Sequence, residues 1–309
     1  TNLSSMSLRI GFMGTPDFAV PSLRILVQNG YKVVGVVTAT DKYGGRGKKQ
    51  LLESPVKKYA VEQGIPVLQP KNLKSPEFQE ELRGLNANLQ VVVAFRMLPE
   101  AVWDLPEYGT FNLHGSLLPR YRGAAPINWA VINGDAETGV TTFFIRHKID
   151  TGDVLFQEKM PIGPNETAGA VHDRMMLLGA ETVLKTVKAI ESGDYQLQKQ
   201  DDALATKAPK LFRETCEIDF TQPIEKVHNF VRGLSPYPAA WTTLEGKQLK
   251  ILRAHYEKAD LDATPGTFRS DNKSWIKIAA PDGWLVVEEL QMQGRKRMKA
   301  NDFLNGFSF

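Results

Sequence analysis

Apolar positions in the first 200 residues follow two alternating patterns. Short runs rich in β-branched residues, such as residues 33–37 and 89–95, are typical of strands buried on both faces of a sheet. Between such runs, segments such as residues 176–190 carry apolar side chains three and four positions apart, which predicts helices with one apolar face. Strands that alternate with helices favour a largely parallel sheet. We therefore expect residues 6–198 to form a Rossmann-like α/β domain.

The pattern changes beyond residue 198. Residues 199–212 are polar and lack periodicity, which predicts a linker. A predicted helix near residues 223–234 is then followed by short strand-like runs with Pro-Gly and Asp-Gly turn signals between them. Several short strands joined by turns are typical of a small antiparallel barrel. We expect residues 213–309 to form a second domain, a small β-barrel of the oligonucleotide-binding (OB-like) type.

Composition places the chain among ordinary globular proteins. Of its 309 residues, 42% are apolar and 24% are charged, which is close to the average for such proteins. No apolar run approaches the roughly 18 residues that a membrane-spanning helix needs. A predicted strand, instead of a targeting peptide, follows the first methionine, Met6, so we expect a cytoplasmic protein. The single cysteine, Cys216, excludes an internal disulfide and a thiolate metal cage.

Positive charge is concentrated in two short runs, although the net charge is only +3. Lysine and arginine gain affinity for phosphates by releasing counterions, so both runs are candidate phosphate-binding sites. The first run lies in a polar loop, residues 41–53, whose glycines predict a mobile segment that becomes ordered only on binding. The candidate side chains of the two runs are Arg46, Lys48, Lys49, Arg295, Lys296, Arg297 and Lys299.

Polar side chains mark the end of one predicted strand, residues 110–114. Asn112 and His114 point to the same face because side chains alternate along a strand. Open α/β sheets bind ligands at the edge formed by the carboxyl ends of their parallel strands. A loop whose path is restricted by glycine and proline follows at residues 115–123. The residues alone leave a structural and a reactive histidine as equal alternatives.

Three short motifs carry a family resemblance. They read NLHGSLLP at residues 112–119, RG at 122–123 and DTGD at 150–153. In this order they resemble the motifs of the 10-formyltetrahydrofolate formyltransferases. The run FMGTPDFA at residues 12–19 and the glycine-rich basic loop are similar to the methionyl-tRNA formyltransferases within that family. One segment departs from the family pattern: residues 95–99 read FRMLP, one residue shorter than the Tyr-Gly-x-Ile-Leu-Pro that the family often has.

The resemblance implies a reaction and a set of site residues. The co-substrate 10-formyltetrahydrofolate would give its formyl group to the α-amino group of methionyl-initiator tRNA, without a metal and on a monomeric enzyme. Asn112 and His114 would stabilise the oxyanion of the tetrahedral intermediate, and Asp150 would help to remove the proton of the attacking amine. The two basic runs would bind tRNA. The residues implied in folate binding are Ser116, Leu117, Leu118 and Pro119.

Other functions compatible with these residues remain as alternatives. Folate-dependent formyltransferases that act on small amines, and hydrolases that release formate, share Asn112, His114 and Asp150. The loop with Arg46 and the C-terminal β domain favour tRNA, because a small acceptor needs neither. A non-catalytic RNA-binding protein on the same scaffold is disfavoured because all three chemical residues are present.

Overall fold

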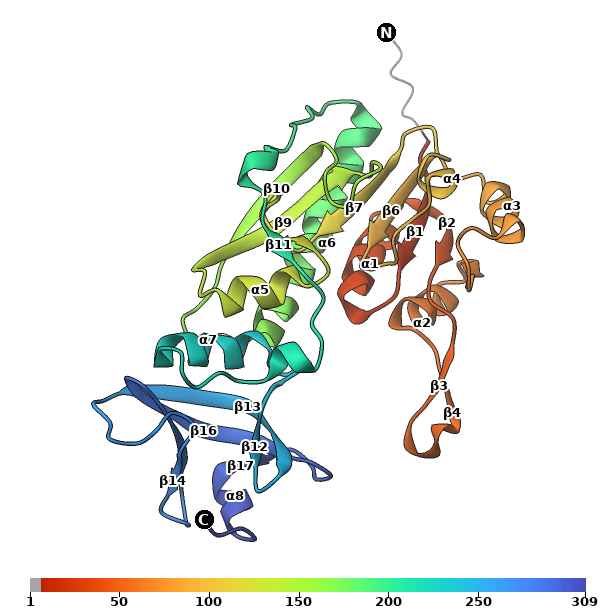
Figure 1. Cartoon of the computed structure of the whole chain (residues 1–309). Helices are drawn as coiled ribbons and strands as arrows, with labels where there is room; N and C mark the ends of the chain where they lie inside the picture. Colours follow the sequence, from red (N-terminus) through yellow and green to blue (C-terminus); the bar gives the residue numbers. More distant parts are fainter. Residues whose placement is uncertain (1–6) are drawn as a thin grey trace. The chain divides into compact units, whose positions relative to one another are not determined.

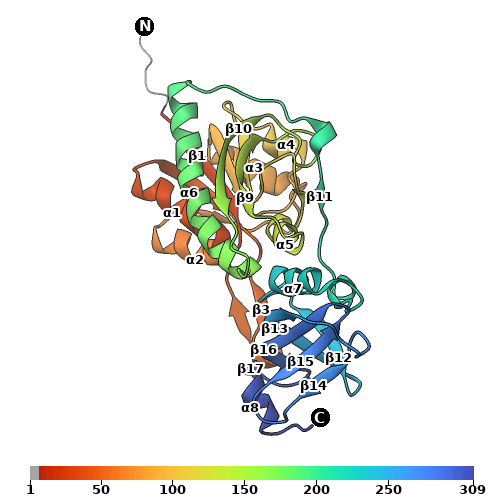
Figure 2. The same ribbon diagram turned by 90° about the vertical axis from the view of Figure 1, so that its left-hand side faces the viewer.

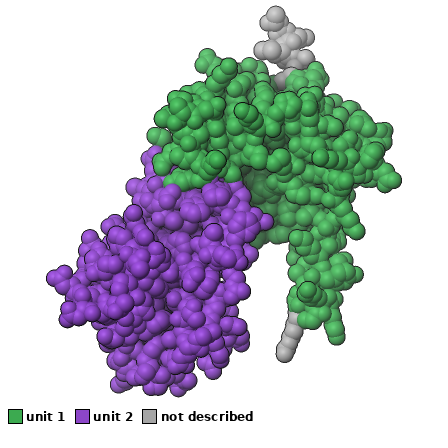
Figure 3. All heavy atoms as spheres, viewed as in Figure 1, with its two compact units in different colours: residues 1–123, 139–160, 173–207 green, residues 124–138, 161–172, 208–309 purple. Residues whose placement is uncertain are grey.

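The computed structural model describes residues 7–309, apart from the side chain of Arg46. The chain divides into two compact units (Figure 3). Within the described residues, no helix is long and apolar enough to cross a membrane. Two stretches that precede the predicted linker, 124–138 and 161–172, belong to the second unit. Unit 1 comprises the chain up to Gly123, Gly139–Met160 and Asp173–Lys207, and unit 2 comprises Ala124–Thr138, Pro161–His172 and Ala208–Phe309.

Unit 1 is built on a seven-stranded sheet with the strand order β10-β9-β7-β6-β1-β2-β5 (Figure 1). Strands β5, β2, β1, β6 and β7 pair in parallel, whereas β9 runs antiparallel to β7. The predicted α/β fold is confirmed, and the strand order reverses at β1 and β6, which places a ligand-binding edge at their carboxyl ends. The strands are β1 (Arg9–Gly14), β2 (Lys32–Val37), β5 (Val67–Leu68), β6 (Leu89–Val93), β7 (Thr110–His114), β9 (Glu137–Phe144) and β10 (Val154–Pro161), with a separate ladder of β8 (Arg122–Gly123) and β11 (Lys207–Ala208).

Helices cover both faces of this sheet (Figure 2). On one face, residues of α3 and α4 pack with Met13, Val37 and Val92 of the sheet. On the other face lies α6, where a Cβ added at Gly179 would come within 2.7 Å of Leu113. The glycine therefore permits the close approach of helix and strand. The helices are α1 (Val20–Gln28), α2 (Pro55–Glu62), α3 (Pro76–Gly84), α4 (Glu100–Trp103) and α6 (Ala168–Ser192).

Ser-Pro pairs begin two of these helices. The hydroxyl oxygen of Ser54 accepts a hydrogen bond from the backbone N–H of Lys57, and Pro55 occupies the first turn of α2. Ser75 and Pro76 play the same parts in α3. A serine cap satisfies an N–H group that has no partner within the helix, and proline is tolerated there because it has no N–H to satisfy. These local signals therefore fix where the helices start.

Residues 41–53 form a β-hairpin, so the prediction of a loop without regular structure was wrong. Strand β3 (Lys42–Gly44) pairs with β4 (Gln50–Leu52), and the chain turns between them at η2 (Arg46–Lys48). The hairpin extends beyond α2 (Figure 1). Three residues of the turn have positive φ angles, 78° at Gly45, 75° at Gly47 and 51° at Lys48, and two of them are glycines. Glycine here therefore shapes a tight turn, which composition alone does not distinguish from flexibility.

The two ends of the hairpin are held by one lysine of α2. The Nζ of Lys57 lies 2.7 Å from Oδ2 of Asp41 and 3.3 Å from Oε2 of Glu53. Gln69 donates a further hydrogen bond of 2.8 Å to Asp41. The hydrogen bonds from Lys57 and Gln69 lower the pKa of the Asp41 carboxyl. The direction of the hairpin is thus coupled to α2 and not left to its own two strands.

Unit 2 combines helices with an antiparallel sheet of strand order β12-β13-β16-β15-β14, and β17 pairs with β16. The sheet forms a half-barrel, and its antiparallel strands agree with the small antiparallel barrel predicted from the sequence. Register shifts near Arg253 interrupt the pairing of β13 with β16, and such irregularities let long strands bend. The elements are α5 (Pro126–Ile132), α7 (Ile224–Gly233), β12 (Ala240–Leu244), β13 (Lys247–Lys258), β14 (Phe268–Ser270), β15 (Ile276–Ala280), β16 (Gly283–Met292), β17 (Met298–Lys299) and α8 (Ala300–Leu304).

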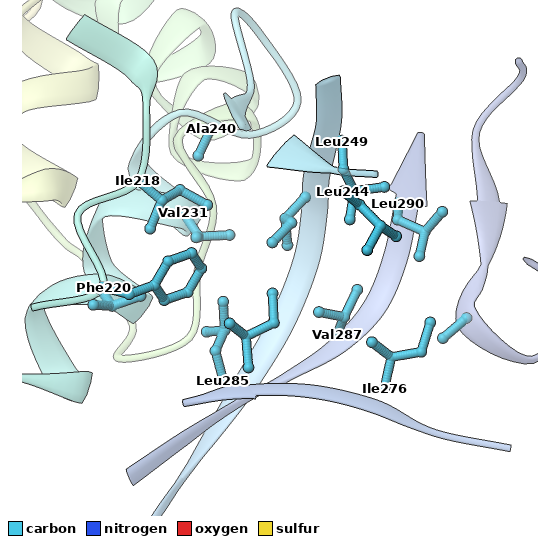
Figure 4. Packing of buried hydrophobic residues seen from close by; sticks show 14 of the residues in the cluster. Ile218, Phe220, Val231, Ala240, Leu244, Leu249, Ile276, Leu285, Val287 and Leu290 are labelled. Atoms are coloured by element: carbon cyan, nitrogen blue, oxygen red, sulfur yellow. The ribbon is translucent and has the colours of Figure 1, made fainter. Parts of the chain in front are cut away.

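The core of unit 2 lies between α7 and the concave face of the sheet (Figure 4). Val231 of α7 and Leu285 and Val287 of β16 belong to this core, each at most 2% exposed. Burial of one such side chain stabilises the fold by about 1.5–3 kcal/mol. Cys216 belongs to the same core, and burial raises the pKa of its thiol. The cysteine is therefore a structural residue.

His228 is a buried titratable group of unit 2. Only 2% of the residue is exposed, its Nε2 lies 3.2 Å from the carbonyl oxygen of Ala254, and its ring contacts Tyr256. Burial, reinforced by the positive charge of Arg232, lowers the pKa of His228 below its ordinary value of about 6.5. The folded protein therefore favours the neutral imidazole.

The low pKa of His228 predicts that acid destabilises unit 2. Between the folded pKa and about 6.5 the unfolded chain binds more protons, so the free energy of unfolding is complete above about pH 6.5 and falls as the pH drops towards the folded value. The loss is about 1.4 kcal/mol per unit of pKa difference. Urea unfolding from pH 7.5 to 5.5 measures it. In His228→Gln the pH dependence should flatten, whereas in His147→Gln, an exposed histidine of unit 1, it should persist. An unchanged slope in His228→Gln would refute the assignment.

Candidate active site

Strand β7 presents Asn112 and His114 on one face of the unit 1 sheet. Leu113 lies between them and points the other way, towards α6. Asn112 pairs with Val92 of β6 and is half-buried. No other described residue forms a hydrogen bond with its side-chain amide. The amide can therefore donate to a ligand at this edge of the sheet.

The imidazole of His114 is buried and fixed through one of its nitrogens. Its Nε2 lies 2.7 Å from the carbonyl oxygen of Tyr121. Because a carbonyl oxygen only accepts, we assign a proton to Nε2, which donates it. Tyr121 itself has a left-handed backbone, with φ at 59°. The other nitrogen, Nδ1, is thus the one that can exchange a proton or contact a reacting group.

Asp150 lies beside Nδ1 of His114. Its Oδ1 is 3.8 Å from Nδ1, which is longer than a hydrogen bond but within the reach of one bridging water. Its Oδ2 accepts a hydrogen bond of 2.8 Å from the backbone N–H of Gly123. Asp150 is 9% exposed and has φ at 56°. A non-glycine residue in this region carries strain of about 1–3 kcal/mol and persists only where its surroundings fix it.

The turn that carries Asp150 is pressed against strand β9. A Cβ added at Gly152 would lie 1.6 Å from the carbonyl oxygen of Phe144. On the other side of the turn, the N–H of Phe144 donates to the carbonyl of Asp153. Glycine is therefore required at position 152 for the turn to reach this position. The structure thus brings Asn112, His114 and Asp150 to one edge of the sheet.

The loop after β7 is held from β9 and β10. The hydroxyl of Thr141 donates to the carbonyl of Ser116 at 2.7 Å and accepts from the N–H of Leu118 at 3.1 Å. The amide of Gln157 donates to the carbonyl of Leu118 at 2.8 Å. Neither Thr141 nor Gln157 is in the resemblance motifs, and a polar side chain inside a strand is their only signal. Together they make the loop a rigid wall.

The four residues implied in folate binding divide into two pairs. Ser116 and Leu118 are buried, and the hydroxyl of Ser116 donates to the carbonyl of Arg120 at 2.6 Å. Leu117 and Pro119 are partly exposed, and the Leu118–Pro119 peptide bond is cis. Surface for a ligand on this loop therefore comes from Leu117 and Pro119, with Ser116 and Leu118 as internal support.

Strand β6 ends earlier than predicted. It stops at Val93, and Ala94 has φ at 52°, so the chain leaves the sheet two residues before Phe95 completes the apolar run. Phe95 turns inward to the cluster around Met13, whereas Met97 is 69% exposed. The shortened segment therefore still packs Phe95 against the core and leaves Met97 exposed.

The predicted tRNA contacts lie in different parts of the chain. Lys48 and Lys49 are exposed at the turn of the hairpin, and the side chain of Arg46 lies outside the described residues. Arg295, Lys296 and Arg297 are exposed in the turn after β16, where Arg297 forms an ion pair with Glu289. The described side chains of both basic runs are thus on the surface, as phosphate binding requires.

A metal site has no support in the described part of the chain, where no group of three or more His, Cys, Asp or Glu side chains is arranged to hold an ion. His147 instead lies 3.8 Å from a carboxylate oxygen of Glu100 and contacts the ring of Trp103. His147 is therefore accounted for as a surface ion-pair residue.

Comparison with known proteins identifies the family. The family described as formyl transferase matches residues 8–187, and the formyl transferase C-terminal domain matches residues 210–308. A methionyl-tRNA formyltransferase of Parabacteroides distasonis is 54% identical, with 97% of this chain and 96% of the relative covered. This chain belongs to the methionyl-tRNA formyltransferases. The resemblance drawn from the motifs is confirmed.

Further relatives extend the comparison. The methionyl-tRNA formyltransferase of Bacteroides thetaiotaomicron is 53% identical, with coverage of 97% of this chain and 96% of the relative. Among solved structures, the sugar 3N-formyl transferase WlaRD, crystallised with dTDP and 5-N-formyl-THF, has a TM-score of 0.67 at 19% identity and covers 94% of this chain and 99% of its own. HypX from Aquifex aeolicus in complex with tetrahydrofolic acid has a TM-score of 0.67 at 18% identity, with 96% and 47% covered. These two structures share the fold.

The close contact at Gly152 yields a prediction for methionyl-tRNA formyltransferase activity. In Gly152→Ala the new Cβ, 1.6 Å from the carbonyl oxygen of Phe144, forces the turn with Asp150 to move. We expect kcat/KM to fall by about 100-fold, because misplacement of a reacting group by roughly 1 Å has this effect. Steady-state formylation assays measure it. Gly84→Ala, where nothing lies within 4 Å, is the control and should stay at wild-type activity. Wild-type activity in Gly152→Ala would contradict the prediction.

Proposed function

We propose that Asn112, His114 and Asp150 form the catalytic site at which the formyl group of 10-formyltetrahydrofolate passes to the α-amino group of methionyl-initiator tRNA. The observation that supports it most is the distance of 3.8 Å between Nδ1 of His114 and Oδ1 of Asp150, two buried groups at the ligand-binding edge of an α/β sheet. A side-chain amide without a partner among the described residues, that of Asn112, lies on the same strand as His114.

The reaction begins with attack of the amine on the formyl carbon. A carbon–nitrogen bond forms, the carbonyl electrons move to oxygen, and a tetrahedral intermediate with an oxyanion results. The amide of Asn112 donates a hydrogen bond to this oxyanion, and a positioned donor of this kind typically contributes about 10²–10³ in rate. Asp150 takes the proton that the amine loses, through one water. Formation of the bond therefore leaves no uncompensated charge on nitrogen.

Collapse of the intermediate completes the transfer. The bond between the formyl carbon and N10 of the folate breaks, and N10 leaves with a proton from Nδ1 of His114. The Nε2–H of His114 stays on the carbonyl of Tyr121, which fixes the plane of the ring during this step. The products are formylmethionyl-tRNA and tetrahydrofolate. The amine has lost one proton to Asp150, and N10 has gained one from His114.

Folate and tRNA are proposed to bind at separate surfaces. Leu117 and Pro119 supply the exposed part of the wall for the folate, and Ser116 and Leu118 keep that wall rigid. The hairpin, with Arg46 at its turn, and the run at residues 295–297 would contact the sugar-phosphate backbone of tRNA. We further propose that the enzyme acts as a monomer in the cytoplasm, where its charged tRNA substrate is made.

Replacement of His114 tests the catalytic assignment. In His114→Ala, kcat should fall by about 10²–10⁴-fold, because general acid catalysis is lost. The Kd for charged tRNA should stay within about twofold, since the basic surfaces are untouched. Single-turnover formylation and filter binding measure the two quantities, and glycinamide ribonucleotide serves as the competing acceptor. Activity of the wild type on that small amine alone would refute the acceptor assignment, and a fully active His114→Ala would refute the site.

Neutralisation of the hairpin lysines tests the tRNA surface. In the double variant Lys48→Gln and Lys49→Gln, the slope of log affinity against log salt should become shallower by about 1 to 2, because each phosphate contact releases counterions. Binding of the folate alone should not change. The matched control replaces Lys32 and Lys188, exposed lysines outside both basic runs, by glutamine. Equal slopes in the two double variants would exclude the hairpin from the interface.

A further inference from the structure

Gln198 and the first residues of the predicted linker, 199–206, lie on the loop beside the proposed catalytic site. Gln198 pairs through its backbone with Val154 of β10. Thr206 donates its N–H to the carbonyl of Pro119 at 3.2 Å, and its hydroxyl accepts from the N–H of Tyr121 at 2.8 Å. This segment, called the strap below (residues 198–206), therefore fixes the same Tyr121 whose carbonyl holds His114.

Gln200 is the strap residue that reaches the turn of Asp150. Its Nε2 donates to the carbonyl oxygen of Asp150 at 2.8 Å and to that of Gly152 at 2.9 Å. Its Oε1 accepts from Nε of Arg122 at 3.2 Å and from Nη2 of the same guanidinium at 3.0 Å. A carboxamide has two donor hydrogens and an acceptor oxygen, so one side chain satisfies both neighbours.

These contacts close a ring of hydrogen bonds around Asp150. Arg122 is followed by Gly123, whose N–H donates to Oδ2 of Asp150 at 2.8 Å. Gln200 therefore binds the backbone carbonyl of Asp150 directly. Through Arg122 it also restrains Gly123, whose N–H orients the carboxylate of Asp150. Arg122 is anchored further by an ion pair of 2.7 Å with Asp202 of the strap.

We propose that Gln200 is a positioning residue of the formyl transfer, which fixes the carboxylate of Asp150 in reach of Nδ1 of His114. The inference rests on the proposed catalytic role of Asp150. The carboxylate and the imidazole lie 3.8 Å apart, and a shift of about 1 Å in the carboxylate changes the distance and direction along which a proton passes between them. The left-handed backbone of Asp150 favours such a shift as soon as its restraints are lost.

The substitution Gln200→Glu removes the hydrogen bonds to the turn of Asp150 and keeps those to Arg122. Glutamate still accepts from Arg122, but it has no hydrogen to donate, so the carbonyls of Asp150 and Gly152 lose their partner and face a negative charge. We expect kcat to fall by about 10- to 100-fold, with KM for both substrates within about threefold. The matched control is Gln198→Glu, the same substitution on an exposed strap side chain, which should keep wild-type kinetics.

A double-mutant cycle distinguishes positioning from a general loss of stability. In an Asp150→Ala background, Gln200→Glu should lower kcat by less than about twofold, because there is no carboxylate left to position. Arg122→Lys breaks the ring from its other side and should reproduce the selective loss of kcat. It also provides the test if Gln200→Glu does not fold, as judged by circular dichroism and the melting temperature.

The outcomes separate the inference from the function on which it rests. Full activity of Asp150→Ala would refute the proposed catalytic role and the inference with it. An inactive Asp150→Ala together with wild-type kcat in Gln200→Glu, or in Arg122→Lys where the former does not fold, would leave the catalytic role intact and overturn the inference. A defect that is equally large in the Asp150→Ala background would also overturn it, since Gln200 would then act independently of Asp150.

Discussion

The burial of one carboxylate beside one imidazole is the constraint on which the site depends. Removal of a carboxylate from water is costly unless hydrogen bonds and an opposite charge compensate. Asp150 receives a hydrogen bond from the N–H of Gly123 and lies 3.8 Å from His114, which carries the compensating charge when protonated. The left-handed backbone at Tyr121 and Asp150 places the groups that make this contact possible. The strain is confined to these two residues, and the surrounding hydrogen bonds hold their backbone in the left-handed conformation.

The fold by itself does not select the acceptor. A sugar formyltransferase has the same fold over nearly the whole chain at 19% identity, whereas the close relatives of this chain are methionyl-tRNA formyltransferases. Acceptor choice must therefore lie in side chains and in local additions to the fold. Under the proposed function, the hairpin coupled to α2 through Lys57 supplies one such set of side chains. A rigid attachment suits this role, because a preoriented contact surface loses less entropy on binding than a mobile one.

Local patterns predicted the parts of the site that depend on neighbours in sequence. Alternation along β7 placed Asn112 and His114 on one face, and the motif at residues 150–153 supplied Asp150. The hydrogen bond from Gly123 to Asp150 joins residues 27 positions apart, which no periodicity reports. The polar, aperiodic sequence of residues 199–212 predicts a linker and does not report these contacts, because side chains such as Gln200 are satisfied by distant partners instead of by a repeating face. Glycines in the hairpin likewise gave a composition that fits a loop and a tight turn equally well.

The fixed orientation of His114 has a consequence for the proton balance of the proposed mechanism. Since Nε2 remains on the carbonyl of Tyr121, Nδ1 is the nitrogen that gives a proton to the departing folate, and it must be reprotonated before the next turnover. The proton that the attacking amine loses is meanwhile on Asp150, 3.8 Å from Nδ1 and within reach through one water. Return of that proton from Asp150 to His114 restores both groups without exchange with bulk solvent. The distance between the two side chains thus matters twice in each cycle, when the amine is deprotonated and when the imidazole of His114 is protonated again.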